Sequence, residues 1–261
     1  MEAILEAKRL CREYEVGGER VAVLKDIGLN IGKGEFVAVM GRSGSGKSTL
    51  LYCISGMDRM SSGEVYFNGK DISCLNDRQM SRLRLTAMGF VFQHSHLLKN
   101  LSIKENIILP ALKAALKPRA EILGYADALM KRLGIDRVGS HDITKVSGGQ
   151  LQRAAICRAL INHPVIIFCD EPTGALNSSA TSEVMNIFND INREGTAILL
   201  VTHDVRVAAR ADRVIFLADG RIDSELVLGK YSEDVCETGG DTGGIDEREG
   251  KLINWLAERG F

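Results

Sequence analysis

The sequence predicts a mixed α/β fold built around a parallel sheet. Three apolar runs have the length of buried strands: "EFVAVM" at 35–40, "PVIIFCDE" at 164–171 and "TAILLVTHD" at 196–204. The last two flank a stretch with helical spacing, "SSATSEVMNIFNDINREG". Buried strands that alternate with helices are typical of a parallel sheet covered on both faces.

The elements at the start of the chain differ from this pattern. Residues 1–40 alternate apolar and polar side chains and contain turn signals at "EVGGER" and "IGKGE", which predicts antiparallel strands. After a loop at 41–48, "STLLYCISGM" has helical spacing, and "SSGEVYFNGKDI" returns to strands and turns.

Residues 94–161 are expected to form a helical insertion. Both "SIKENIILPALKAALK" and "AEILGYADALMKRLGI" show helical periodicity, and little between them reads as strand. The strand pattern then resumes and ends with "RVIFLADGRI". We therefore predict one domain over residues 1–222, with a core formed by 1–93 and 162–222.

Residues 223–261 are expected to form a C-terminal extension. The stretch "ETGGDTGGIDEREG" is acidic, rich in glycine and nearly free of large apolar residues, which is typical of a linker. The last segment, "REGKLINWLAERGF", predicts a short amphipathic helix. This helix either docks on its own domain, which we favour, or contacts a partner.

Composition excludes several classes of function. The net charge is -1, so no strong field favours nucleic acid or an anionic membrane surface, and we expect no nucleic-acid partner. The first residues, "MEAILEAKRL", lack the basic start and long apolar core of a secretory signal. Apolar runs such as "TAILLV" fall far short of the roughly 20 residues that span a bilayer. We expect a chain that is neither exported nor membrane-spanning.

The loop "GRSGSGKST" carries the most specific motif. It matches the phosphate-loop pattern G-x-x-x-x-G-K-[ST], and it follows a predicted strand and opens a predicted helix. In such a loop, backbone N–H groups wrap the phosphates, Lys47 meets the outer phosphates and the Ser48 hydroxyl binds Mg²⁺. This predicts a phosphate loop that binds the phosphates of a nucleotide together with Mg²⁺. The candidate nucleotide-binding residues here are Gly41, Ser43, Gly44, Ser45, Gly46, Lys47, Ser48 and Thr49.

A pair of acidic residues supplies the second part of the predicted site. In "VIIFCDEPTGA" a buried strand ends at Asp170 and Glu171, and ligand sites of parallel sheets lie at the carboxyl ends of the strands. Asp170 is placed to hold Mg²⁺, and Glu171 to polarise an attacking water.

Three further side chains fit a nucleotide site. Gln93 ends a predicted strand at the border of the helical insertion, where it could contact Mg²⁺ or the water and act in catalysis. His203 follows "LLVT" and is placed to contact the γ-phosphate. Tyr14 lies upstream of the phosphate loop and either stacks on adenine or is an ordinary strand tyrosine.

A second anion-binding loop lies about a hundred residues after the first. In "KVSGGQLQR", a serine and two glycines open a predicted helix, and a helix N-terminus attracts phosphate. Since the first loop already provides a phosphate site, the role of Ser147, Gly148, Gly149 and Gln150 is a separate question.

The motifs "GRSGSGKST", "FVFQ", "VSGGQLQR", "CDEPTGALN" and "VTHD" occur in an order and spacing that resembles the nucleotide-binding subunit of ABC transporters, over residues 1 to about 222. The resemblance implies an ABC ATPase fold: a RecA-like core with an antiparallel β subdomain and a helical insertion. It also implies a homodimer in which Ser147, Gly148, Gly149 and Gln150 contact the ATP of the other subunit.

The sequence departs from the family pattern at two positions. The signature usually begins with leucine and here begins with Val146, a small apolar change. The loop after Glu171 usually ends in aspartate, and here it has Asn177, which keeps hydrogen bonding and loses the charge. Communication across the dimer is the property that this second change puts in question.

Within the family, the chain resembles the group of MacB, LolD and BceA-like ATPases, and "TGALNS" with "LINWLAERGF" leans toward the branch for resistance to antimicrobial peptides. The resemblance implies an integral membrane permease subunit as partner, a peripheral place on the cytoplasmic face of the membrane, and docking of a permease helix near residues 94–116. Alternatives are a lipoprotein-release or cell-division ATPase, an importer ATPase, an ATPase of DNA repair or the ribosome, and an ATP sensor.

Overall fold

The computed structural model describes residues 2–231 and 245–261 of the chain. These residues divide into two compact units. Unit 1 contains Met1–Leu75 and Asn192–Phe261, and unit 2 contains Asn76–Ile191. Both units combine strands with helices, so the predicted mixed α/β class is confirmed.

Unit 1 begins with an antiparallel sheet, as the alternation in residues 1–40 predicts. Its strands are β1 (Ala3–Val16), β2 (Glu19–Gly32), β4 (Ser62–Phe67) and β5 (Lys70–Asp71), in the spatial order β2, β1, β4, β5. A tight turn at Gly17 and Gly18 joins β1 to β2, and both glycines have positive φ, a region open mainly to glycine.

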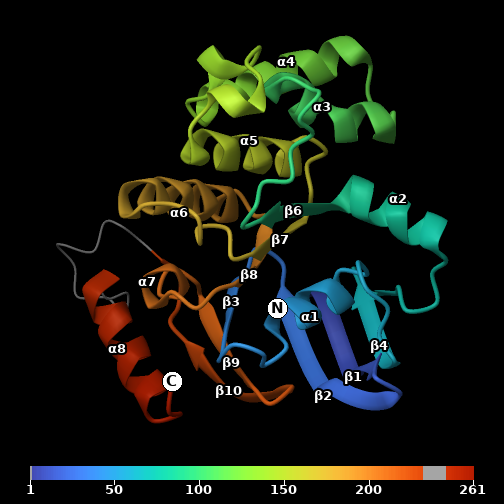
Figure 1. Cartoon of the computed structure of the whole chain (residues 1–261), viewed down its shortest axis with the longest axis vertical. Helices are drawn as coiled ribbons and strands as arrows, with labels where there is room; N and C mark the ends of the chain where they lie inside the picture. The colour runs from blue at the N-terminus through green and yellow to red at the C-terminus, as the bar shows by residue number, and fades with distance from the viewer. Residues whose placement is uncertain (1, 232–244) are drawn as a thin grey trace. The chain divides into compact units, whose positions relative to one another are not determined.

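Unit 1 also contains parallel strands, which include the first predicted buried strand. β3 (Phe36–Met40) lies between β8 (Ala197–Val201) and β9 (Arg213–Ala218) and is parallel to both. Every residue of β3 and β8 is buried, which explains their continuous apolar sequences. β10 (Arg221–Val227) pairs antiparallel with β9. The helices are α1 (Lys47–Ile54), α7 (Val205–Ala208) and α8 (Ile245–Ala257), and α8 packs on α7 (Figure 1).

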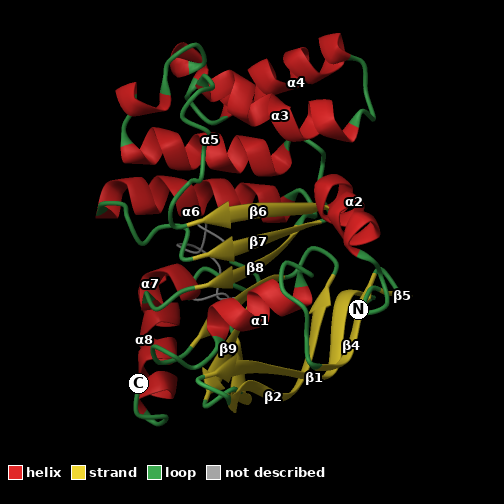
Figure 2. Cartoon of the chain, turned by 45° about the vertical axis from the view of Figure 1, so that its right-hand side comes forward, coloured by secondary structure: helices red, strands yellow, loops and turns green. Residues whose placement is uncertain are grey.

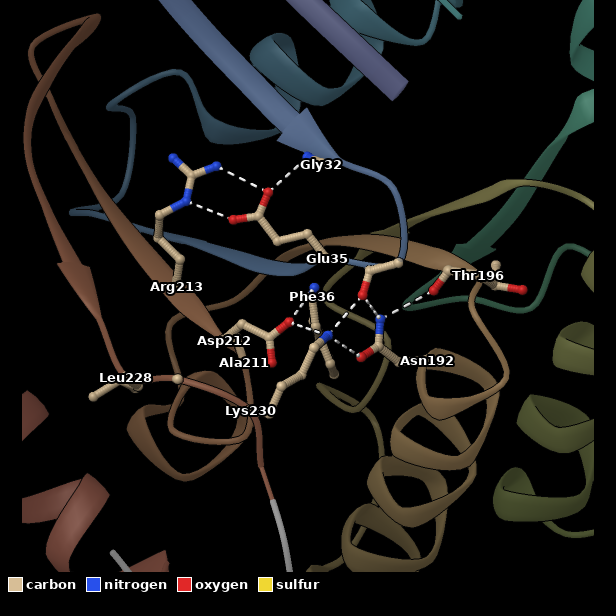
Figure 3. Close-up of polar contacts among 12 residues, drawn as sticks. Gly32, Glu35, Phe36, Asn192, Thr196, Ala211, Asp212, Arg213, Leu228 and Lys230 are labelled. Atoms are coloured by element: carbon tan, nitrogen blue, oxygen red, sulfur yellow. Dashed lines mark hydrogen bonds and ion pairs between the residues drawn. The ribbon is translucent and has the colours of Figure 1, made fainter. Parts of the chain in front are cut away.

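A polar network fixes the start of β3 (Figure 3). The Glu35 carboxylate accepts hydrogen bonds from Arg213 Nε at 2.8 Å and from the Gly32 N–H at 2.7 Å. The Asp212 carboxylate accepts from the Phe36 N–H at 2.9 Å and from Lys230 Nζ at 2.6 Å. Because these carboxylates bind backbone N–H groups as well as cations, they set the place where β3 begins beside β9.

Unit 2 contains two parallel strands and most of the helices (Figure 2). β6 (Met88–Phe92) pairs with β7 (Ile166–Asp170) over their whole length. Helices α3 and α4 pack on each other and on α5, which in turn packs on β6. The helices are α2 (Asp77–Ala87), α3 (Ile103–Ala114), α4 (Arg119–Arg132), α5 (Gly148–Leu160) and α6 (Ser178–Arg193), with short 3-10 turns at Asp136–Val138 and Ile143–Lys145.

The compact units have other bounds than the predicted insertion and domain, and the domain bounds themselves stay a prediction. Unit 2 extends beyond the predicted insertion of 94–161 on both sides, because α2, β6, β7 and α6 cluster with α3, α4 and α5. β10 continues to Val227, past the predicted domain end at 222. No residue of β10 is fully buried, so this edge strand lacks the apolar pattern that marks β3 and β8.

The predicted C-terminal helix is present as α8 and docks within unit 1. Residues 237–244 of the predicted linker lie outside the described residues, while 245–250 belong to α8. No helix in the described ranges has the length and apolar character that a membrane span needs.

Candidate nucleotide site

The phosphate loop joins β3 to α1 in unit 1. Gly41 leaves no room for a side chain, because a Cβ there would lie 2.2 Å from the Leu217 carbonyl oxygen and 2.8 Å from Ser45 Oγ. Gly46 precedes α1 with φ of 100°, a conformation that side chains rarely adopt. The path of the backbone therefore requires both glycines of the motif. Because they have no side chains, main-chain atoms alone surround the start of α1 at these positions.

The start of α1, like that of α4, lacks a side-chain cap, which distinguishes it from the starts of α2, α3 and α5. Helices α2, α3 and α5 each begin with a reciprocal capping box, whereas α1 has no side-chain cap. The buried Ser45 Oγ has no hydrogen-bond partner among the described residues. An uncapped helix N-terminus beside an orphaned hydroxyl fits a phosphate group, which accepts hydrogen bonds from both.

The Lys47 side chain folds back onto the phosphate loop. Its Nζ donates to the carbonyl oxygens of Gly41 at 2.8 Å and Arg42 at 2.9 Å. Phosphate oxygens would compete with these carbonyls for the ammonium group. Ser43 and Gly44 are exposed on the loop, and Ser48 and Thr49 are half-buried in the first turn of α1.

His203 lies at the same edge of the sheet as the phosphate loop. Val39 of β3 pairs with Val201 of β8, so Gly41 and His203 each follow a paired residue by two positions. The Thr202 N–H donates to the Val39 carbonyl at 3.1 Å, which continues the alignment beyond the strands. His203 is exposed at this edge.

Tyr14 belongs to a small polar cluster on unit 1. Its hydroxyl donates to Asp58 Oδ2 at 2.6 Å, and the Arg12 guanidinium lies 4.2 Å from the centre of its ring. Arg12 also donates to Asp58 Oδ1 at 2.9 Å. One ring face is thus occupied by a cation, and stacking on adenine would use the other face.

Unit 2 brings Gln93, Asp170 and Glu171 together. Phe92 pairs with Asp170 across β6 and β7, so Gln93 and Glu171 are the residues that follow the two strand ends. The Gln93 side chain reaches the loop after β7, where its Nε2 would lie 3.0 Å from a Cβ on Gly174. Glu171 has φ of 49°, which is uncommon for a residue with a side chain and occurs often at functional sites.

Gln152 is a further residue of this cluster that the sequence analysis does not single out. Its side chain is 3% exposed, and its Nε2 donates to the carbonyl oxygens of Phe92 at 3.0 Å and Pro172 at 2.6 Å. It therefore ties the residue before Gln93 to the residue after Glu171. One signal in the sequence could have indicated this residue: Gln152 is a polar side chain on the face of α5 that also carries the buried Ala155 and Ile156.

The second anion-binding loop begins α5 in unit 2. Ser147 is the N-cap: its Oγ accepts from the Gln150 N–H at 3.3 Å, and Gln150 Oε1 accepts from the Ser147 N–H at 2.9 Å. Gly148 and Gly149 follow in the first turn. A groove runs from this turn to the start of α6, and it is lined in part by Ser147, Gly148, Gly149, Arg153, Asn177 and Glu183.

Asn177 helps to begin α6 at the other side of this groove. Its Oδ1 accepts a hydrogen bond from the Ala180 N–H at 2.9 Å. The amide thus supplies the capping oxygen that an aspartate would provide, without the negative charge.

The fold and the phosphate loop define an ATPase of the P-loop class. A family model described as "ABC transporter" matches residues 24–174, more than half of the chain, and the chain belongs to this family. The predictions of an ABC ATPase fold and of an ATP-hydrolysing domain are confirmed by this match and by the structural relatives.

The curated relatives are longer proteins. The chain is 42% identical over 252 residues to the macrolide export ATP-binding/permease protein MacB of Marinobacter nauticus, covering 97% of this chain and 38% of the relative. It is 43% identical over 224 residues to MacB 2 of Aeromonas hydrophila, covering 86% and 34%. The chain therefore spans little more than a third of the length of these relatives, and the predicted resemblance to the MacB-containing group is confirmed.

Solved structures of similar size match over most of the chain. A dimeric post-hydrolysis state of the ATP-binding cassette MJ0796, bound to ADP and Pi, is 37% identical with a TM-score of 0.81, covering 87% of this chain and all of that one. The cbiO1 structure from Clostridium perfringens is 30% identical with a TM-score of 0.76, covering 86% and 88%.

Proposed function

We propose that the phosphate loop binds ATP and that hydrolysis drives export through a membrane partner. The observation that carries this proposal is the start of α1, which lacks a side-chain cap and lies beside the orphaned Ser45 hydroxyl. A cradle of backbone N–H groups and a lysine suits the polyphosphate of a nucleotide.

The roles of the remaining site residues rest on the family resemblance. The resemblance assigns Ser48, Asp170 and Gln93 to Mg²⁺, which they would hold through oxygen atoms, the donor type that this ion prefers. The ion would neutralise charge on the phosphates. Glu171 accepts a proton from the attacking water, His203 contacts the γ-phosphate and Tyr14 stacks on the adenine.

We further propose an ATP-dependent homodimer in which Ser147, Gly148, Gly149 and Gln150 of one subunit contact the nucleotide of the other. A dimeric relative of the same fold, MJ0796, supports this proposal. The two glycines at the start of α5 expose main-chain N–H groups on the wall of a groove, where an anion of a second subunit could enter.

The proposed cargo class is antimicrobial peptides or antibiotics, and the partner is an integral membrane permease that holds the chain at the cytoplasmic face. The curated relatives are named as macrolide exporters with a permease part. The exposed apolar side chains of α3 and its C-terminal end support a docking surface for the permease, and they are Leu109, Leu112 and Leu116.

Reconstitution with the permease tests this function. ATPase activity of the complex in liposomes is measured with macrolides, with cationic antimicrobial peptides and with a lipoprotein or small solute as comparison. Stimulation by the first two classes alone supports export. Activity that responds only to a periplasmic binding protein and its solute would indicate an importer instead.

A further inference from the structure

The C-terminal helix α8 is anchored by a buried arginine. The Arg248 side chain is 2% exposed and donates four hydrogen bonds to backbone carbonyls. The acceptors are Ala209 and Ala211 after α7, at 2.7 and 2.6 Å, and Leu228 and Gly229 after β10, at 2.9 and 3.1 Å. A cation buried against four carbonyls fixes the start of α8 on unit 1.

The other end of α8 packs on β9. The Trp255 and Phe261 rings meet the Phe216 ring edge-on, with centroids 6.2 and 5.9 Å apart. Arg259 reaches Ser224 of β10 and lies over the Trp255 ring at 4.4 Å. The segment after α8 is thus held against the same strand that flanks β3.

This position brings the segment to the phosphate loop. Phe216 pairs with Met40, the residue before Gly41, and the Leu217 carbonyl oxygen occupies the space that a Cβ on Gly41 would need. The rings of Trp255 and Phe261 therefore pack on the strand position that borders the loop.

A direct contact completes the link. The Arg42 guanidinium of the phosphate loop donates to the Gly260 carbonyl oxygen. The backbone carbonyl of Arg42 in turn accepts from Lys47 Nζ at 2.9 Å. Arg42 therefore connects the C-terminal segment to the lysine that the phosphate loop presents to a nucleotide.

We propose that the C-terminal segment positions the phosphate loop for ATP and that Arg42 is the positioning residue through which it acts. A glycine-rich loop loses much conformational freedom when it closes on a ligand. A contact that restrains the loop beforehand lowers this cost and strengthens binding. This role for residues 245–261 lies beyond the proposed transport function, since it concerns binding by one chain.

The Gly260→Ala variant tests the contact without altering the phosphate loop. Gly260 has φ of 69°, and a Cβ there would lie 2.9 Å from Arg42 Nη2, so alanine displaces the guanidinium. Since a hydrogen bond contributes modestly to binding, we expect the Kd for a fluorescent ATP analogue to rise by roughly three- to tenfold. The kcat at saturating ATP should stay unchanged, whereas a general loss of folded protein would lower kcat.

Gly69→Ala is the matched control. Gly69 has φ of 74°, close to that of Gly260, and no atom lies within 4 Å of the place where its Cβ would be. Both variants place an alanine at a similar positive φ, and only the alanine at position 260 reaches Arg42. Equal affinities of Gly260→Ala and Gly69→Ala would overturn the proposal.

A double-mutant cycle with Arg42→Ala separates positioning from a direct contact of Arg42 with ATP. If Arg42 acts through the C-terminal segment, Gly260→Ala has no further effect on the Kd in the Arg42→Ala background. Additive effects would refute the coupling.

Arg221→Ala, at an exposed arginine on β10, is the control for loss of charge. If Gly260→Ala fails to fold, Phe261→Ala replaces it in the cycle. A wild-type chain that binds no ATP would contradict the proposed function itself.

Discussion

At the scale of single residues, the backbone of Glu171 carries strain at the place where a catalytic base is proposed. Its φ of 49° costs on the order of 1–3 kcal/mol for a residue with a side chain. The Gly174 N–H donates to the Glu171 carbonyl at 3.1 Å, and Gln152 donates to the carbonyl of Pro172. These bonds hold the backbone conformation at Glu171.

Glu171→Gln should remove turnover and keep ATP binding. The amide has nearly the same shape and cannot accept the proton of an attacking water. We expect kcat to fall by about 10²-fold or more, as for loss of a general base, and the ATP-bound dimer to accumulate. Phosphate release and size-exclusion chromatography with ATP measure both effects. Unchanged turnover would show that Glu171 is not the base.

Gln152→Glu should lower kcat by more than a loss of folded protein would account for. The carboxylate cannot donate to Phe92 or Pro172, so both Gln93 and Glu171 lose a support. We expect a fall in kcat of about tenfold or more, corresponding to roughly 1.4 kcal/mol in the barrier, with little change in KM for ATP.

Asn162→Asp provides the comparison for Gln152. Asn162 also donates its amide to a carbonyl, that of Leu85 at 2.8 Å, but this carbonyl belongs to α2, which precedes β6, whereas Gln93 follows β6. Both variants should lose stability by about 1–3 kcal/mol in urea unfolding, because each leaves at least one carbonyl without its donor. If both lose kcat equally, Gln152 has only a structural role.

At the scale of elements, the sequence predicts those whose apolar pattern is strong. Nearly all residues of β3, β7 and β8 are buried, and the sequence predicts these strands as well as α3, α4 and α6. The sequence does not predict helix α2, because Met80 is its only buried residue and its apolar periodicity is weak. Its N-terminal signal was the capping box of Asn76 and Gln79, which uses polar residues alone.

The anchor of α8 is also an element that pattern alone does not reveal. An arginine in "DEREGK" reads as an exposed charge, yet Arg248 is buried, because α8 places it over four backbone carbonyls that accept its hydrogen bonds. Burial lowers the pKa of Arg248, and the nearby Asp212 carboxylate opposes this shift. Contacts of this kind depend on tertiary structure and leave no periodic trace in the sequence.

Arg248→Met should detach the start of α8. Methionine fills part of the volume, but the four carbonyls lose their donors, so we expect a loss of about 3 kcal/mol in the free energy of unfolding. Lys251→Met on the same helix, at a half-exposed position, should change it by less than about 0.5 kcal/mol. Urea unfolding and hydrogen exchange of α8 measure the difference. Equal stabilities would contradict the anchoring role.

At the scale of the whole molecule, the order of motifs identifies the family, and the two units carry different parts of the predicted site. Unit 1 holds the phosphate loop, Tyr14 and His203, and unit 2 holds Gln93, Asp170, Glu171 and the loop at Ser147. Sequence patterns describe local elements, so they predict which residues each unit contributes. The proposed dimer and the bound nucleotide lie outside what the pattern of one chain can contain.

Ser147→Arg should separate binding by one chain from assembly. The substitution places a large cation at the start of α5 and removes the N-cap hydroxyl, while the phosphate loop of the same chain is untouched. Nucleotide affinity of the monomer should stay within about twofold of wild type, and ATP-dependent dimerisation and turnover should be lost. Ser147→Asp retains a capping oxygen and serves as the control for helix stability. A Ser147→Arg chain that dimerises with ATP would refute the shared site.

The turn between β1 and β2 is a suitable place to insert a tag. Gly17 and Gly18 have no atom within 4 Å of the place where a side chain would begin, and Val16 and Val21 beside them are exposed at 61% and 45%. Such a loop tip tolerates insertions well. A fluorophore or affinity peptide inserted there leaves Gly260 and Phe261 undisturbed. A fusion joined directly after Phe261 would disturb the segment that contacts Arg42.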